Sequence, residues 1–410
     1  MDMLSLAWRN LWCNRRRTII TLTALALSTM LVQGTHNLSF GVYQRMIDSG
    51  VRAGSGHLAV YQAGYLETRD EKLNFAPEGL VREIAATDGV AAALPRVLLP
   101  GLAQSSRDSR SIILTGVDSE AEVGINPFLK EFSKPELTQM LQGRGAVIGA
   151  KLLKELQLEP GQKFVVTVQR SDGVLGSELF RVRGVVKTGL KEIDGSLVLV
   201  RRDKAATLGD LGGRIHELAI VLESAGTSHQ LQPLLAALLK ERQGLNLVTW
   251  EESMSNLANA IKLDYASQKF IFLLLLVIVT IGVINTQLMS VMERFREFGV
   301  MLALGATPGR LRSLILFESL LLGVCGVILG TILGSLLTWY LVDVGIDLRS
   351  FISGDLEFGG VIFDPIMRAM WDYAWMGQIG CYVVLLALWA ALYPAYKAGK
   401  ISPVRAMRHT

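Results

Sequence analysis

The chain has 410 residues, of which 50% are hydrophobic and only 19% are charged, and its mean hydropathy is +0.36. This composition is too apolar for a soluble protein with a single core, and it favours a chain that is partly embedded in a membrane. The formal net charge is only +4 and the basic residues are spread along the chain, so no basic patch for nucleic acid is expected.

Residues 1–17 predict an amphipathic helix that ends in three arginines. One face carries the apolar residues Leu4, Trp8, Leu11 and Trp12. Tryptophans beside basic residues are typical of a helix at the cytoplasmic membrane interface. The alternative is the start of a cleaved signal peptide, but no convincing small-x-small cleavage site follows at the right place. Residues 18–40 then predict the first membrane span.

No apolar run between residues 41 and 267 is long enough to cross a membrane. Short β-branched stretches, bounded by turn-forming residues, predict strands there. These stretches are HLAVYQ, SIILTGV, GAVIG, KFVVTVQR, LFRVRGVVKTG, SLVLVRR, HELAIVLE and LNLVTW. Helical patterns fall between them, at 78–86, 135–142, 150–157, 229–242 and 251–266. The segment therefore predicts a large extracytoplasmic α+β domain, inserted between the first and second spans.

The pattern inside this domain predicts two lobes. Residues 116–210 contain a strand–helix–strand unit followed by a compact β unit. They are expected to form a lobe inserted between two halves of another lobe, at 55–115 and 214–262.

Three further apolar stretches complete a prediction of four transmembrane helices, at 268–292, 313–341 and 374–396. Each has some 20 or more mostly apolar residues, enough at about 1.5 Å per residue to cross a hydrocarbon core of about 30 Å. A short segment at 342–373 and a tail at 397–410 remain. Basic residues near the N-terminus, in 293–312 and in the tail fall on one side. The positive-inside rule assigns that side, with both termini, to the cytoplasm, and therefore the large domain to the periplasm.

The turn at 293–312, between the second and third spans, has its own helical pattern. A charged face comprises Glu293, Arg294, Arg296 and Glu297. Apolar residues spaced three or four apart are Val291, Phe295, Phe298, Met301, Leu302 and Leu304. Gly305 and the Pro308–Gly309 pair are expected to end this helix. The pattern predicts a short interfacial helix held between two spans. Such a helix is expected to act as a lever, because a push on it moves both spans.

Polar and small residues inside the predicted spans indicate helix contacts. Glu318 carries a charge at a depth where insertion costs at least about 2.5–3.5 kcal/mol. We interpret Glu318 as paired with an arginine such as Arg312 or Arg294; a proton or ion relay is the alternative. Further polar positions are Gln33, Asn285 and Gln287. A stripe of small residues in the third span predicts close packing with another helix. It comprises Gly323, Gly326, Gly330 and Gly334.

The segment VMERFREFGVMLALGATPGRLRSLILFES resembles the signature of the MacB/FtsX/LolC-type permeases of ABC transporters. The matching motif is S-V-x-E-R-x-R-E-(apolar)-G from Ser290 to Gly299, followed by A-L-G-A at 303–306 and Glu318. The tail, from Tyr393 to Ala406, is similar to the closing motif of this family. The resemblance implies an ATPase-coupling surface comprising Glu293, Arg294, Arg296, Glu297, Phe298, Gly299, Leu304, Gly305 and Ala306. It also implies a sabre-like lobe at 116–210 between porter-like halves.

The resemblance implies a permease subunit that works by mechanotransmission. A separate ATPase dimer would drive it, beside a second permease copy or a paralogue. The large domain and the lack of a preceding ATPase favour the lipoprotein-releasing type, in which a lipoprotein substrate passes to a periplasmic carrier. Membrane lipid would then enter between the first two spans, near Gln33, Asn285 and Gln287. The alternatives are a MacB-like efflux or export permease, an FtsX-like signalling protein that moves no cargo, and a sensor for an extracytoplasmic ligand.

No catalytic constellation stands out in the sequence. The phosphate-binding pattern G-x-x-x-x-G-K-[ST] does not occur, and the five histidines form no metal-binding pair. We therefore expect no enzymatic activity, cofactor or metal in this chain, and ATP hydrolysis by the partner subunit. A membrane-anchored enzyme is the least supported alternative.

Overall fold

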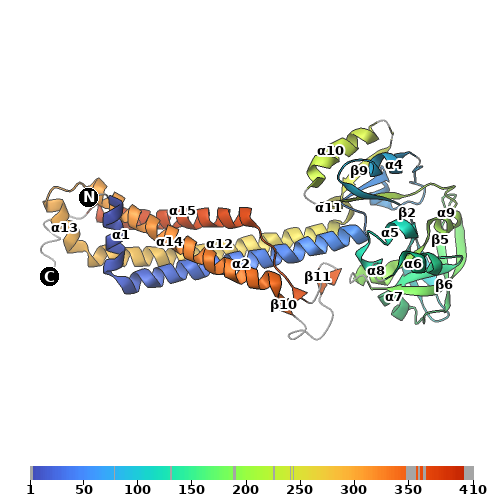
Figure 1. Ribbon diagram of the computed structural model, residues 1–410, viewed down its shortest axis with the longest axis horizontal. Helices are drawn as coiled ribbons and strands as arrows, with labels where there is room; N and C mark the ends of the chain where they lie inside the picture. Colours follow the sequence, from blue (N-terminus) through green and yellow to red (C-terminus); the bar gives the residue numbers. More distant parts are fainter. Residues whose placement is uncertain are drawn as a thin grey trace. The chain divides into compact units, whose positions relative to one another are not determined.

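The structure is a computed structural model. It describes residues 3–77, 79–129, 132–187, 191–224, 227–240, 242, 244–347, 357–358, 361–362 and 366–400. The chain divides into two compact units (Figure 1). The helical unit comprises Met1–Tyr43, Leu263–Ile352 and Pro365–Thr410, and the sheet unit comprises Gln44–Lys262 and Ser353–Asp364. The tail motif at 401–406 lies outside the described residues.

The helical unit is built from long helices that run side by side (Figure 1). Its helices are α1 (Met3–Cys13), α2 (Arg15–Ala53), α12 (Ser255–Glu293), α13 (Phe295–Ala303), α14 (Pro308–Asp343) and α15 (Tyr373–Ala398), although the end of α2 and the start of α12 are assigned to the sheet unit. Two short strands, β10 (Ile346–Asp347) and β13 (Ile366–Met367), pair with each other. Within the described ranges, four helices are long and apolar enough to cross a membrane: α2, α12, α14 and α15.

All four of these helices extend beyond the predicted spans, and α2 and α12 do so most. The first was expected to end at residue 40, but α2 continues to Ala53. The predicted helix at 251–266 and the predicted span at 268–292 merge into α12, which begins at Ser255. The physical reason is that hydropathy marks where the apolar part of a helix ends, whereas the helix itself continues until a cap or a breaker stops it.

Side chains from several helices form the core of the helical unit. The buried members of its central cluster are Leu25, Val32, Val283, Ile379, Val383 and Ala390. They come from α2, α12 and α15, and Val327 of α14 packs against them. Four segments that are distant in sequence therefore share one apolar interior.

The sheet unit contains one sheet of nine described strands. These are β1 (Leu58–Gln62), β2 (Val90–Gln104), β3 (Ser109–Val117), β4 (Gly145–Gly149), β5 (Lys163–Gln169), β6 (Leu175–Val186), β7 (Leu197–Arg201), β8 (Glu217–Leu222) and β9 (Leu245–Thr249). Their order is β3-β7-β4-β6-β5-β2-β8-β1-β9, with a further pairing between β2 and β3. That pairing closes a ring of strands from β3 round to β2, while β8, β1 and β9 extend outward from β2.

Strand β2 joins the ring to the outer strands. Its first part, Val90–Arg96, pairs with β8, whereas its second part, from Val97, pairs with β3 and with β5. The sequence placed the lobe boundary at residue 116, inside β3, but the register places all of β3 in the ring. The patterns of individual strands locate strands and do not indicate their pairing partners, so the division into two lobes at residue 116 stays a prediction.

The sequence analysis also missed β2 itself. Pro95 and Pro100 interrupt its apolar run, and proline usually argues against a strand inside a sheet because it lacks an N–H donor. In the structure Pro95 lies opposite Leu218, and Pro100 lies opposite Ile113. The hydrogen bonds and contacts along the rest of this long strand outweigh the tendency of proline to be excluded from a strand.

Short helices complete the sheet unit. They are α3 (Tyr65–Thr68), α4 (Leu80–Ala85), α5 (Ser119–Glu122), the 3₁₀ helix η1 (Pro127–Leu129), α6 (Lys134–Met140), α7 (Ala150–Glu155), α8 (Lys191–Ser196), α9 (Arg202–Leu208), α10 (Ser228–Leu239) and α11 (Trp250–Ser253). Strands β11 (Glu357–Phe358) and β12 (Val361–Ile362) form a small hairpin. The main core of the unit includes fully buried Leu58, Leu99, Phe164, Phe180 and Ile220.

Candidate functional site

Helix α13 is a separate short helix between α12 and α14. The helical path breaks at Arg294, which has φ −98° and ψ 15°. After Leu304 the chain turns through Gly305, whose φ of 92° lies in the left-handed region that favours glycine. Thr307 then caps α14, because its hydroxyl accepts a hydrogen bond from the backbone N–H of Arg310. Local signals therefore set both ends of α13.

One face of α13 is anchored by apolar contacts. Phe298 is 1% exposed and Gly299 is also buried. The buried residues clustered with Phe298 are Val291, Leu311, Ile315, Ala395 and Ala398. They belong to α12, α14 and α15. Burial of a phenylalanine typically contributes about 1.5–3 kcal/mol, so this face is held firmly against three long helices.

A buried ionic cluster forms a second anchor. The guanidinium Nη1 of Arg294 donates to Oε1 of Glu318 over 2.8 Å, and Nδ2 of Asn10 donates to the same oxygen over 2.8 Å. Arg294 also bonds Glu297 over 3.0 Å and stacks on the ring of Phe298. The prediction that Glu318 pairs with an arginine is confirmed, and of the two arginines proposed the partner is Arg294. Arg312 instead lies over the ring of Tyr396.

Glu293 connects the end of α12 to the start of α2. Its Oε2 accepts hydrogen bonds from Asn14 Nδ2 and Arg17 Nη1, both over 2.9 Å. Asn10 of α1 already bonds Glu318, so both α1 and α2 are connected to the segment around α13. Sequence reasoning missed Asn10, Asn14 and Arg17, because nothing in their spacing relates them to the later motif.

The opposite face of α13 carries exposed side chains. Arg296, Glu297 and Val300 are exposed, and Leu304 just after the helix is 84% exposed. Gly305 is exposed as well, and Ala306 is half-buried. A helix with one face anchored and one face exposed can receive a partner without unfolding.

The glycines of α14 lie against α2 and α15. A Cβ added to Gly326, Gly330 or Gly334 would meet its nearest atoms within 2.5–2.8 Å. The α2 residues that it would meet are Leu25, Thr29 and Gln33 respectively. A Cβ on Gly323 would meet Ala387 of α15 at 3.0 Å. These glycines let the helix backbones approach closely.

The polar residues of the predicted spans have separate surroundings. Gln33 is fully buried and its Nε2 donates to Thr331 on α14, while its Oε1 has no partner among the described residues. Asn285 is exposed and Gln287 is 3% exposed, both on α12. A small apolar cavity between α2, α12 and α15 has none of the three in its lining.

A polar cluster that the sequence did not predict ties α2 to α15. His36 Nε2 lies 3.1 Å from Asp372 Oδ2, and its ring stacks on Trp375 with centroids 3.6 Å apart. Asn37 Nδ2 donates to the hydroxyl of Thr338 over 3.0 Å. Single polar residues in apolar runs are a weak signal, and their partners emerge only from helix packing.

Another buried ionic cluster lies in the sheet unit. Arg96 is 4% exposed and donates from Nε and Nη2 to Glu122, over 2.6 and 2.9 Å, and from Nη1 to Glu217 over 3.3 Å. Burial opposes the charged form of Arg96, but the two carboxylates outweigh it and raise the pKa of this guanidinium. The described residues contain no group of three or more His, Cys, Asp or Glu side chains that could hold a metal.

Long apolar helices and a large α+β unit define a membrane-embedded protein with an attached folded domain. Comparisons with known families agree with this class. The family model of the FtsX-like permease C-terminal domain matches residues 269–403, and that of the MacB-like periplasmic core domain matches residues 18–238. The chain therefore belongs to the MacB/FtsX/LolC–LolE family of ABC-transporter permeases.

Several characterised proteins are similar to this chain. The lipoprotein-releasing system transmembrane protein LolC of Neisseria meningitidis is 24% identical over 375 residues, which cover 86% of this chain and 89% of LolC. The pyoverdine export ATP-binding/permease protein PvdT of Pseudomonas putida is 26% identical, over 99% of this chain and 59% of PvdT. The crystal structure of the periplasmic region of MacB from Actinobacillus actinomycetemcomitans shares 15% identity. It covers 53% of this chain and 99% of that region, with a TM-score of 0.35.

Proposed function

We propose that this chain is a permease subunit in a bacterial inner membrane, with four spans and both termini in the cytoplasm. The four long apolar helices support the number of spans. The basic residues near the N-terminus and in 293–312 support the orientation. In chain order, residues 44–262 of the sheet unit fall between the first two spans, which would place this unit in the periplasm.

ATP hydrolysis by a separate ATPase dimer would drive the permease through α13. The observation that carries this proposal is the two-sided arrangement of α13. Its inner face is anchored by Phe298 and by the Arg294–Glu318 pair, and Leu304 is exposed beside its outer face. A force on the outer face would therefore reach α12, α14 and α15 together. A second copy of this chain, or a paralogue, would complete the transporter.

The proposed cargo is a lipoprotein, which the complex would release from the inner membrane to a periplasmic carrier. The similarity to LolC supports this cargo because it covers most of both chains. Export of a small molecule is the second candidate, favoured by the similarity to PvdT over 99% of this chain.

The test is reconstitution of the permease with its ATPase in lipid nanodiscs, together with a fluorescent lipoprotein and a soluble carrier. Leu304→Glu places a charge on the exposed outer surface, so it should leave the permease folded but abolish ATP-dependent release. Leu102→Glu is the matched control, since Leu102 is also exposed but belongs to β2 of the sheet unit. Normal release by Leu304→Glu would refute the coupling role. ATP-dependent transport of a small molecule without lipoprotein release would favour the second candidate.

A further inference from the structure

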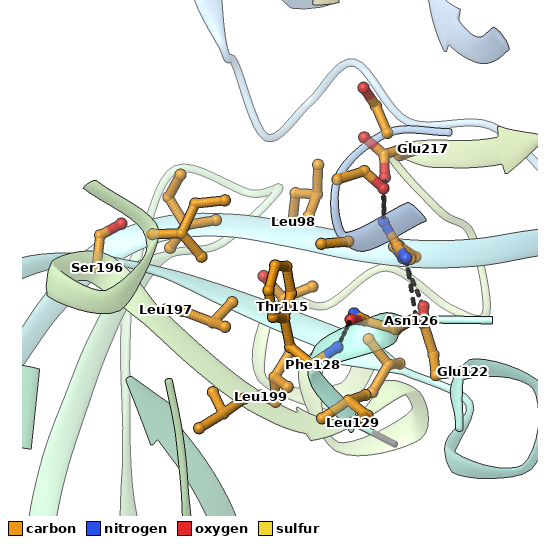
Figure 2. A pocket seen from close by; sticks show the side chains of 18 residues that line it. Leu98, Thr115, Glu122, Asn126, Phe128, Leu129, Ser196, Leu197, Leu199 and Glu217 are labelled. Atoms are coloured by element: carbon orange, nitrogen blue, oxygen red, sulfur yellow. Dashed lines mark hydrogen bonds and ion pairs between the residues drawn. The ribbon is translucent and has the colours of Figure 1, made fainter. Parts of the chain in front are cut away.

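A cavity of about 180 Å³ lies within the sheet unit, lined mainly by residues of β2, β3 and β7 and of the short helices α5, η1 and α8 (Figure 2). Most of the residues that line it are apolar, among them Leu98, Ile113, Phe128, Leu197 and Leu199. Apolar cavities of about 150 Å³ are known to bind benzene. This cavity therefore has room for one aromatic ring or a short branched chain.

Two polar side chains in the lining each have one donor group without a partner among the described residues. Thr115 and Asn126 are each 8% exposed. The backbone N–H of Phe128 donates to Oδ1 of Asn126 over 3.0 Å, which leaves the Nδ2 group as the free end of the amide. Across the described part of the chain, neither this Nδ2 group nor the Thr115 hydroxyl has a hydrogen-bond partner. Neither atom is among the fully buried unpaired atoms of the described residues, so both reach open space, where a ligand could accept their hydrogen bonds.

The charges beside the cavity restrict the sign of the ligand. Arg96, Glu122 and Glu217 all line it, and Arg96 bonds both carboxylates, which Figure 2 labels. The hydroxyl of Tyr61 also donates to Glu217. This cluster satisfies its own hydrogen bonds, but two carboxylates against one guanidinium leave an excess of negative charge. A carboxylate ligand would be repelled there.

We propose that this cavity binds a small neutral ligand with an apolar ring or short branched chain and one carbonyl oxygen, as in a ketone or an ester. Asn126 Nδ2 and the Thr115 hydroxyl would donate to the carbonyl, while the leucines and Phe128 enclose the apolar part. The ligand would also touch Gly54 and Ser55, just beyond the end of α2, because these residues line the cavity too. The site depends neither on the ATPase nor on the cargo of the proposed function.

The test uses the full-length permease alone in nanodiscs, with fluorinated probes followed by ¹⁹F NMR. The probes are 4-fluoroacetophenone, 1-ethyl-4-fluorobenzene without the oxygen, and anionic 4-fluorobenzoate. The ketone should bind about tenfold tighter than the hydrocarbon, and the benzoate should not bind. Ile113→Trp, which fills the cavity from a partly exposed position, should abolish ketone binding. Leu102→Trp, a similarly exposed residue that does not line the cavity, is the matched control.

Two variants test the hydrogen bonds without filling the cavity. Thr115→Val and Asn126→Asp should each weaken the ketone about fivefold and leave the hydrocarbon unchanged. Asn126→Asp keeps the oxygen that accepts from Phe128, so the local turn is preserved. Three results would overturn the proposal: no saturable ketone binding at millimolar concentration, equal affinity for all three probes, or ketone binding that persists in Ile113→Trp.

Discussion

Replacing Glu318 with leucine removes the acceptor that joins Arg294 and Asn10. The Glu318 side chain is 5% exposed and that of Arg294 is 16% exposed, so both lie largely outside solvent. Removing one partner of a buried ion pair typically costs about 3–5 kcal/mol of unfolding free energy. Arg294 keeps its bond to Glu297 and some solvent contact, which favours the lower end, about 3 kcal/mol.

Replacing both partners should be milder than replacing one. In the double variant Arg294→Met with Glu318→Leu no buried charge is left unpaired, and the remaining loss is the Asn10 hydrogen bond, about 1 kcal/mol. The second replacement should therefore recover about 2 kcal/mol. Glu297→Leu is the control, because the side chain of Glu297 is 66% exposed and its surface ion pair should contribute less than about 1 kcal/mol.

The assay is chemical and thermal unfolding of the purified permease in detergent, followed by tryptophan fluorescence. The same variants are then reconstituted with the ATPase. If the anchor transmits force, both the single and the double variant should lose cargo release, although only the single variant is strongly destabilised. Equal destabilisation of the two variants would refute the ion-pair argument. Normal release by the double variant would show that apolar packing alone holds α13.

Three further predictions concern packing, buried charge and pH. Gly330→Ala brings a Cβ to within 2.5 Å of Thr29 and should lower the unfolding free energy by about 1–2 kcal/mol. Gly282→Ala, whose Cβ would have no atom within 4 Å, should not lower it, and equal melting temperatures for the two variants would contradict this. Arg96→Met leaves two buried carboxylates without their partner and should lower the unfolding free energy in denaturant by about 3–5 kcal/mol. Arg201→Met on the surface should lower it by less than about 1 kcal/mol, and similar losses for the two variants would refute the argument. Burial lowers the pKa of His216, so its stabilising contribution is complete above the unfolded pKa of about 6.5 and is lost as the pH falls below that value. His216→Gln should therefore flatten the decline of melting temperature between pH 7 and pH 5, and an unchanged slope would count against this argument.

The segment around α13 was predictable because its signals are local. Charged and apolar residues alternate at helical spacing from Glu293 to Leu304, and Gly305 and Pro308 mark the turn. An arginine partner for Glu318 also followed from this layout, with Arg312 and Arg294 as the candidates. Glu318 and Arg294 are 24 positions apart, on consecutive helices joined by a short turn, so few alternatives existed for a charge inside an apolar helix.

The contacts of α1 and α2 with this segment could not be predicted in the same way. Asn14 and Arg17 bond Glu293 although they lie 279 and 276 positions before it in the sequence. Such contacts depend on how the helices are arranged around one another. Hydropathy identifies the helices but does not determine that arrangement. The glycine stripe of α14 predicts that another helix packs closely, but it does not indicate that this helix is α2.

The cavity in the sheet unit lies furthest from sequence reasoning, because it depends on β2. Arg96 sits where the first part of this strand, paired with β8, gives way to the second part, paired with β3 and β5. Its partners Glu122 and Glu217 are 26 and 121 positions away. Because the sequence analysis did not recognise β2, it could not assign Arg96 to a strand. Without that assignment, the face of the sheet on which the Arg96 side chain lies cannot be deduced. The closure of the ring, rather than any motif, places Thr115 beside that cluster, and the turn after α5 places Asn126 there. Ligand sites of this kind can therefore be sought only once the strand pairing is known.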